Sequence, residues 1–194
     1  MALTTKLNKA CFAIRAIKLI LTLKVLIMTY YSYFHSVMSY GIIFWRPSHL
    51  SNNIFRIQKR MIRIITNKSR RDSCRQVYKQ LQILTLPGQY VYSLLMFVSR
   101  FRELFVSKSD IHDKNIRYNL NLHLPSTNLK LVQRGVLYLG INFFNHLPIS
   151  IKLLFKDPMH FKIKLRRFLL EHSLYSLDEY FNVTPNETYF TNTI

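Results

Sequence analysis

Residues 53–75 read NIFRIQKRMIRIITNKSRRDSCR, and this stretch decides the fold. Its apolar side chains recur at helical spacing, at Ile54, Ile57, Met61 and Ile64. An apolar residue at every third or fourth position predicts an α-helix with one buried face. Lysines and arginines fall largely outside that stripe. The predicted helix, which begins near Asn53, therefore has an apolar face and a basic face.

The same stretch carries a strong excess of positive charge. Between Arg56 and Lys79 there are nine lysines and arginines against one acid, Asp72. A solvated surface explains most charge runs, but so large an imbalance favours contact with phosphates. The predicted nucleic-acid-binding residues are Arg56, Lys59, Arg60, Arg63, Lys68, Arg70, Arg71 and Arg75.

Acidic residues are absent from the first 71 positions, which hold thirteen lysines and arginines. This part of the chain therefore has no carboxylate to hold Mg²⁺ or to act as an acid or base. We therefore predict a binding surface here and no catalytic centre.

The hydrophobic content is typical of a folded protein, and the excess of positive charge favours an anionic partner. The chain has 194 residues, a formal net charge of +19 and 49% hydrophobic residues, enough to fill a core. So much positive charge repels itself in the compact state, and an anionic partner would relieve that repulsion. Nucleic acid is the first candidate, and an anionic membrane surface is the second.

Residues 10–31 are apolar enough to suggest a membrane span, but Arg15, Lys18 and Lys24 interrupt them. A charge at the bilayer centre is costly, so two short helices are favoured over one span. Thr22 is expected to cap the second helix, which could run to Trp45. The same charges disfavour a signal peptide, and the unbroken apolar pattern past residue 40 disfavours a mitochondrial presequence.

The remainder of the chain also has helical periodicity. Ser73 is expected to cap a short helix, and helices are expected from Pro87, over 138–146, over 149–155 and from Pro158. A long polar loop over 107–126, with a short strand near 120–124, is the best domain boundary. The predicted fold is mainly α, with a helical bundle over 1–106, a smaller mixed, mostly helical unit over 107–181 and a frayed tail over 182–194.

Residues that often carry chemistry form no convincing site. The seven histidines are scattered and show no ligand spacing beside a cysteine, so no metal or cofactor is predicted. Cys11 and Cys74 are interpreted as reduced thiols. Cys74 precedes Arg75, a cation that could lower the thiol pKa, although a half-buried structural thiol is the default. The aromatic residues between Tyr30 and Trp45 could stack on bases, although dense helical aromatics are more often core.

Seven short strings, in order along the chain, carry a resemblance to a known family. They are Tyr40-Gly41-Ile42-Ile43-Phe44-Trp45, Gln58-Lys59-Arg60-Met61-Ile62-Arg63-Ile64-Ile65, Arg71-Asp72-Ser73-Cys74-Arg75, Leu84-Thr85-Leu86-Pro87, His123-Leu124-Pro125-Ser126, Phe144-Asn145-His146-Leu147-Pro148 and Phe168-Leu169-Leu170-Glu171-His172-Ser173. Together they resemble the C-terminal region, the thumb and beyond, of reverse transcriptases from insect jockey-like non-LTR retrotransposons. The likeness covers roughly residues 6–182. Ile116 departs from the Thr-Arg pair that the family usually shows at Ile116-Arg117.

The resemblance implies a helical thumb-like domain over 1–106 that grips a template–primer duplex or RNA–DNA hybrid. The family's polymerase needs the paired aspartates of a Tyr-X-Asp-Asp motif to hold two metal ions. This sequence contains no such motif. Any Mg²⁺ would belong to a missing palm domain, with which this chain could associate, so we expect a detached, non-catalytic fragment that is not itself an enzyme. Expected localisation is intracellular, in the nucleus or cytoplasm, and not secreted. Two alternatives stay open: a non-functional structural remnant of a truncated mobile element, and a basic amphipathic membrane-surface protein.

Overall fold

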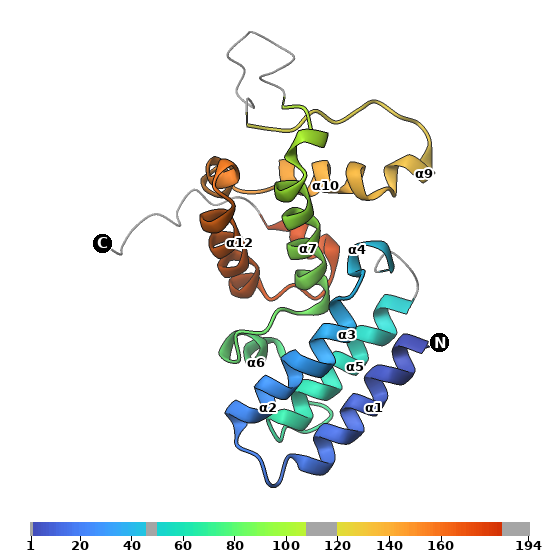
Figure 1. Ribbon diagram of the computed structural model, residues 1–194, viewed down its shortest axis with the longest axis vertical. Helices are drawn as coiled ribbons and strands as arrows, with labels where there is room; N and C mark the ends of the chain where they lie inside the picture. Colours follow the sequence, from blue (N-terminus) through green and yellow to red (C-terminus); the bar gives the residue numbers. More distant parts are fainter. Residues whose placement is uncertain (1, 46–49, 108–119, 184–194) are drawn as a thin grey trace, which may run out of the picture. The chain divides into compact units, whose positions relative to one another are not determined.

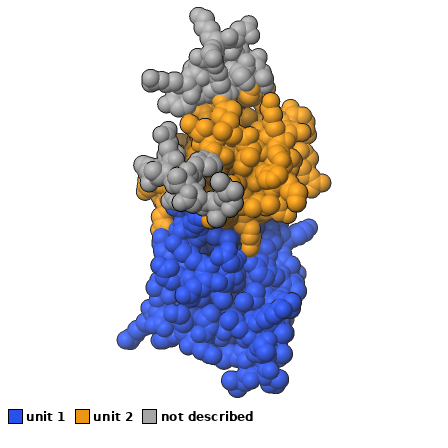
Figure 2. All heavy atoms as spheres, turned by 90° about the vertical axis from the view of Figure 1, so that its left-hand side faces the viewer, with its two compact units in different colours: residues 1–90, 170–175 blue, residues 91–169, 176–194 orange. Residues whose placement is uncertain are grey.

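The computed structural model describes residues 2–45, 50–107 and 120–183. The protein is mainly α-helical, as predicted, and its contacts divide it into two compact units, coloured in Figure 2. Unit 1 comprises residues 1–90 and 170–175, and unit 2 comprises residues 91–169 and 176–194. The change from one unit to the other falls inside helix α7, whereas the sequence-based boundary lies at residue 106. That domain division stays a prediction.

Seven helical elements and the start of an eighth build most of the described part of unit 1, to which the end of α12 (Pro158–His172) also belongs (Figure 1). They are α1 (Ala2–Ile17), α2 (Leu23–Thr29), the π-helical η1 (Tyr30–His35), α3 (Ser36–Ser39), α4 (Ile42–Trp45), α5 (Leu50–Ile65), α6 (Arg75–Gln80) and the first turns of α7 (Leu86–Arg100). No helix of the described residues is long and apolar enough to cross a membrane. The interrupted stretch 10–31 folds as the two helices α1 and α2, as expected.

The apolar stripe predicted for residues 54–64 faces the core of unit 1. Ile54, Ile57, Met61 and Ile64 are all buried, and α5 packs against α1, whose Leu7 and Ile14 are also buried. α5 begins at Leu50, a few residues before the predicted start near Asn53.

The predicted second helix, from Thr22 to Trp45, is wrong in two respects. Thr22 stands at the N-cap of α2 with an extended backbone, but its side chain makes no capping hydrogen bond. The helix does not continue to Trp45, because α3 ends at Ser39 and Gly41 has a φ of +61°. That left-handed conformation suits glycine, and the chain turns there before the short α4.

The helix starts predicted at Ser73 and Pro87 have different outcomes. The N-cap of α6 is Cys74, and the Ser73 hydroxyl accepts only a long hydrogen bond, 3.4 Å, from the Arg75 amide. The predicted cap at Ser73 is therefore displaced by one residue. Pro87 lies in the first turn of α7, where its missing N–H costs no helical hydrogen bond, as predicted.

One polar side chain lies at the centre of unit 1. Gln58 of α5 is fully buried, and its Nε2 donates to Tyr30 Oη (3.0 Å) and to the Leu84 carbonyl (2.9 Å). Its Oε1 accepts from the Leu86 amide at 2.8 Å. A buried amide with its donors and acceptor satisfied fixes a unique register between the elements it joins. Here it ties α5 to η1 and to the start of α7.

Unit 2 contains the rest of α7, η2 (Arg102–Leu104), α9 (Lys130–Gln133), α10 (Val136–Asn145), α11 (Ile149–Lys152), η3 (Leu153–Lys156), most of α12 (Pro158–His172) and α13 (Leu177–Asn182). The predicted helices over 138–146 and 149–155 correspond to α10 and to α11 with η3. The predicted strand near 120–124 does not form. Its described residues make a single antiparallel bridge, between Ser107 and Leu122, and a 2.8 Å hydrogen bond from the His123 amide to the Val106 carbonyl.

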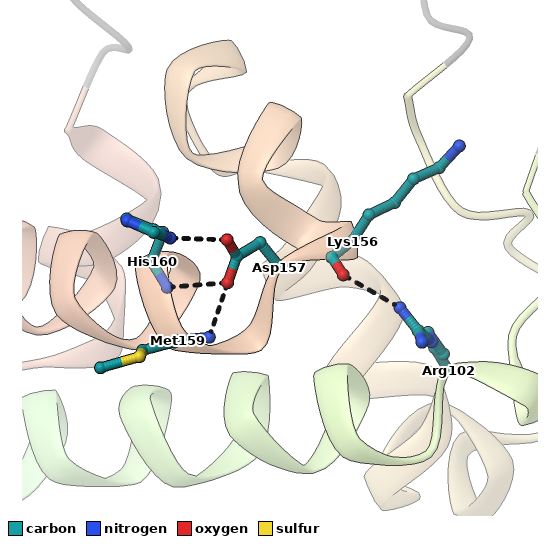
Figure 3. Close-up of polar contacts among 5 residues, drawn as sticks. All are labelled: Arg102, Lys156, Asp157, Met159 and His160. Atoms are coloured by element: carbon teal, nitrogen blue, oxygen red, sulfur yellow. Dashed lines mark hydrogen bonds and ion pairs between the residues drawn. The ribbon is translucent and has the colours of Figure 1, made fainter.

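Pro158 begins α12, as predicted, and Asp157 caps it (Figure 3). One carboxylate oxygen of Asp157 accepts from the amides of Met159 (3.0 Å) and His160 (3.2 Å), while the other contacts the His160 ring. The His160 side chain and these amides lower the pKa of Asp157. Arg102 donates to the carbonyl of Lys156, just before this cap, at 3.3 Å. Predictions for Ile116-Arg117 and for most of the tail from 182 onward lie outside the described residues.

The buried Lys152 helps to fix residues 121–122, which precede the helices α9 to α13 of unit 2. Lys152 Nζ donates to Asn121 Oδ1 (2.9 Å) and to the Asn145 carbonyl (2.6 Å). The Asn145 side chain in turn pairs with the backbone N–H and C=O of Leu122, at 2.8 and 2.9 Å. Burial lowers the pKa of Lys152 from 10.5 to about 8.

Because the pKa of Lys152 is lower in the folded protein than in the unfolded chain, the free energy of unfolding should depend on pH. Between pH 8 and 10.5 the unfolded chain holds the Lys152 proton more tightly than the folded chain does, so folding stability should rise with pH. Relative to a Lys152→Met variant, the unfolding free energy of the wild type should increase by about 1–3 kcal/mol between pH 7.5 and 10. Urea unfolding at each pH measures this difference. The exposed Lys156→Met variant is the control, and parallel profiles for wild type and Lys152→Met would contradict the prediction.

Candidate nucleic-acid interface

Four of the predicted binding residues lie on one face of α5. Arg56, Lys59, Arg60 and Arg63 occupy positions i, i+3, i+4 and i+7, which a helix brings to one side. Arg56 and Arg60 are exposed, and Lys59 and Arg63 are half-buried. The two-faced helix predicted from the sequence is thus present.

The turn that follows α5 is fastened to this face. α5 closes with Asn67 in a left-handed conformation (φ +54°) and with the Lys68 amide donating to the Arg63 carbonyl at 3.1 Å. The Arg63 guanidinium then donates twice to the Asp72 carbonyl, from Nε at 3.2 Å and from Nη2 at 2.9 Å. Arg63 therefore joins the helix face to the segment 68–72 that carries three further cations.

Asp72 is the single acid in this segment, and its carboxylate is engaged by the backbone. Its Oδ2 accepts from the Ser69 amide at 2.9 Å, and its own amide donates to the Ser69 carbonyl at 3.2 Å. Together these bonds close a tight turn over residues 69–72. The exposed side chains of Lys68, Arg70 and Arg71 surround that turn without forming an ion pair within the described part of the chain.

Lys59 and Arg75 rest on aromatic rings. Lys59 Nζ lies 4.6 Å from the centroid of Phe55 and 5.5 Å from that of Tyr175, while the Arg75 guanidinium lies 4.4 Å from the Tyr175 centroid. Cations over ring faces are held electrostatically without losing their charge. Burial lowers the pKa of Lys59, and repulsion from Arg63 and Arg56 lowers it further. These two cations are thereby positioned at the edge of the α5 face.

All eight predicted residues thus belong to unit 1, and the structure links α5, the 69–72 turn and α6 into one surface. We call these eight residues, Arg56, Lys59, Arg60, Arg63, Lys68, Arg70, Arg71 and Arg75, the basic cluster. Unit 1 as a whole holds fifteen lysines and arginines against two acids, Asp72 and Glu171, a net charge of +13. Unit 2 accounts for the remaining +6.

Tyr175 is a member of this site that sequence reasoning missed. It belongs to the segment 170–175, which begins 90 residues after the end of α6, and it packs edge-to-face on Phe55 with ring centroids 5.2 Å apart. The segment is fixed by Thr85 Oγ1, which donates to the Leu174 carbonyl at 2.5 Å. No local pattern around Tyr175 signals a role beneath Lys59 and Arg75, because the pairing is tertiary.

The pKa of Cys74 is raised and not lowered, which favours the default interpretation of a structural thiol. Burial raises that pKa, and it outweighs the opposing effects of Arg63, Lys59 and Lys68. Cys74 is fully buried, not half-buried, and its Sγ lies 3.9 Å from the Lys59 carbonyl. Cys11 is also a buried free thiol, with a pKa raised to about 11 by burial.

The aromatic residues between Tyr30 and Trp45 divide into two groups. Tyr30 and Phe34 are fully buried and stack with centroids 5.4 Å apart, so they belong to the core. Tyr40 and Phe44 are exposed, at 83% and 75%. Across the described residues, no group of three or more histidine, cysteine, aspartate or glutamate side chains is placed to hold a metal ion.

Comparisons with known proteins identify no family for this chain. No family model, no curated protein and no solved structure matches the chain.

Proposed function

We propose that this protein binds the phosphate backbone of nucleic acid through the basic cluster, as the non-catalytic C-terminal part of a retrotransposon RNA-directed DNA polymerase. The family origin rests on the seven ordered strings that resemble the thumb and following region of jockey-like reverse transcriptases. The binding role rests on the chemistry of unit 1. Lysine and arginine side chains position a duplex through its phosphates and do not read its sequence.

One observation carries the proposal. The cations of α5 and the 69–72 turn share a surface, and seven of the eight, Arg75 set aside, make no ion pair with a carboxylate of the described residues. Hydrogen bonds to carbonyls, as at Arg63, and ring faces, as at Lys59, fix geometry and leave the charge unneutralised. Such a surface suits a polyanion, whose bound counterions are released when phosphates are neutralised.

The proposal assigns no chemical step to this chain. Incorporation of deoxynucleotides needs paired aspartates that hold two metal ions, and in the proposed parent protein those belong to the palm. The site of action would be inside the cell, in the nucleus or cytoplasm, on a template–primer duplex or hybrid.

The test is the salt dependence of binding to a blunt DNA duplex and to an RNA–DNA hybrid, followed by fluorescence anisotropy between 50 and 200 mM KCl. With four to six phosphates neutralised, the slope of log K against log salt should be about −4 to −5 on duplex DNA, with little sequence preference. A flat dependence would refute phosphate binding. Tighter binding to anionic vesicles than to either nucleic acid would instead favour the membrane-surface alternative, and aggregation of the isolated chain would favour a remnant.

A further inference from the structure

An exposed phenylalanine lies beside the basic cluster on the neighbouring helix. Phe12 of α1 is 76% exposed, whereas Leu7 and Ile14 of the same helix are fully buried. α1 packs against α5, and the two helices are bridged on their exposed side by Arg60 Nη1, which donates to Asn8 Oδ1 at 3.4 Å. Asn8 is one helical turn before Phe12, so both residues lie on the same face of α1.

The spacing along α1 and one hydrogen bond from α5 indicate which cations lie near Phe12. A helical side chain leans back over the preceding turn, which places the Phe12 ring over the turn of Asn8, the residue that Arg60 binds. Arg15 follows Phe12 by three residues, and both Arg15 and Arg60 lie close enough to the adjacent Cys11 to act on its pKa. Helix geometry and the Asn8 hydrogen bond therefore place the exposed Phe12 near Arg15 of α1 and Arg60 of the basic cluster.

We infer that Phe12 is a stacking platform for an unpaired base of a nucleic-acid strand whose phosphates are held by Arg60 and Arg15. The inference rests on the proposed function and deepens it, because it names single-stranded nucleic acid, or the unpaired end of a duplex, as the ligand of this part of the surface. Bases within a duplex are already stacked on one another and offer no free face. An aromatic side chain among phosphate-binding cations is the arrangement that binds single strands without regard to sequence.

The experiment compares Phe12→Leu with the wild type on two probes, a labelled 12-nucleotide single strand and a blunt 12-base-pair duplex, at several salt concentrations. Phe12→Leu should weaken single-strand binding about 5- to 100-fold at every salt concentration, leave the salt slope unchanged and alter duplex binding less than about twofold. Phe12→Tyr should restore single-strand affinity, since the stacking face is retained. Leu131→Ala, which truncates another exposed apolar side chain outside the basic cluster and outside the aromatic residues of 30–45, is the control and should bind both probes as the wild type does.

Failure of the stacking platform and failure of the proposed function would give different binding results. Unchanged single-strand binding by Phe12→Leu, or an equal loss on both probes, overturns the stacking platform and leaves the proposed function standing. Salt-independent binding of both probes by the wild type overturns the proposed function, and the platform falls with it. Circular dichroism of each variant ensures that any loss of affinity is measured on a folded protein. Weakening of single-strand binding by Phe12→Tyr equal to that by Phe12→Leu also overturns stacking.

Discussion

Replacing Arg56, Arg60, Lys68, Arg70 and Arg71 together by glutamine should weaken binding to duplex DNA by at least about 100-fold at 50 mM salt. These five side chains are exposed, and α5 buries its opposite face, so the fold should persist. Lys59, Arg63 and Arg75 are kept because they hold rings or the 69–72 turn in place. The salt slope should shrink by up to about 4.5, which is about 0.9 for each phosphate that the variant no longer neutralises. Anisotropy titrations at four salt concentrations measure both quantities.

The matched control removes five exposed cations from unit 2: Lys130, Arg134, Lys156, Lys162 and Lys164. Both variants have the same net charge, so a general electrostatic attraction would affect them alike. We expect the control to keep much more of its affinity than the basic-cluster variant does. Equal weakening, with both proteins still helical by circular dichroism, would show that diffuse charge is responsible and that the basic cluster is no specific surface.

Gln58→Ala should lower the free energy of unfolding by about 3–5 kcal/mol. It leaves a cavity in α5's buried face and removes the partners of three groups: the Leu86 amide, the Leu84 carbonyl and the Tyr30 hydroxyl. Because a domain of this size is stable by only about 5–15 kcal/mol, the variant should unfold at much lower urea concentration.

A second substitution separates the cavity from the hydrogen bonds. Gln58→Met preserves most of the volume yet leaves the same three groups unpaired, so it should still cost about 2–4 kcal/mol. Gln76→Ala, an exposed glutamine of α6, is the control and should change the unfolding free energy by less than about 0.5 kcal/mol. A Gln58→Met variant as stable as the wild type would mean that these hydrogen bonds contribute little.

The parts of the fold that sequence analysis predicted are those set by local periodicity. The stripe Ile54, Ile57, Met61 and Ile64 repeats every three to four residues, and a buried helix face is the physical cause of that spacing. The starts of α7 and α12 were signalled by Pro87 and Pro158 for an equally local reason. Breaks within apolar runs were harder to predict. Gly41 ends α3 inside an unbroken apolar pattern, where a single backbone angle outweighs periodicity.

The candidate site divides in the same way. The basic residues themselves are visible in the sequence, as is their placement on one side of α5. Their mutual positions are not, because they depend on contacts between distant segments: Arg63 with the Asp72 carbonyl, and Lys59 and Arg75 with Tyr175. The sequence predicts a structural thiol at Cys74 but shows only a neighbouring cation, whereas burial, a tertiary property, sets the pKa of this thiol.

The return of residues 170–175 to unit 1 has a consequence for the order of events during synthesis. The ribosome must add about 85 residues after Tyr90 before Tyr175 exists, which takes roughly 5–15 s at the usual elongation rates. Throughout that interval Thr85 lacks the Leu174 carbonyl, and Lys59 and Arg75 lack the ring on which they rest. During that interval the nascent N-terminal helices lack these contacts, and they are strongly cationic and close to ribosomal RNA. A chain truncated before residue 170 would never form the contacts of Leu174 and Tyr175 with unit 1.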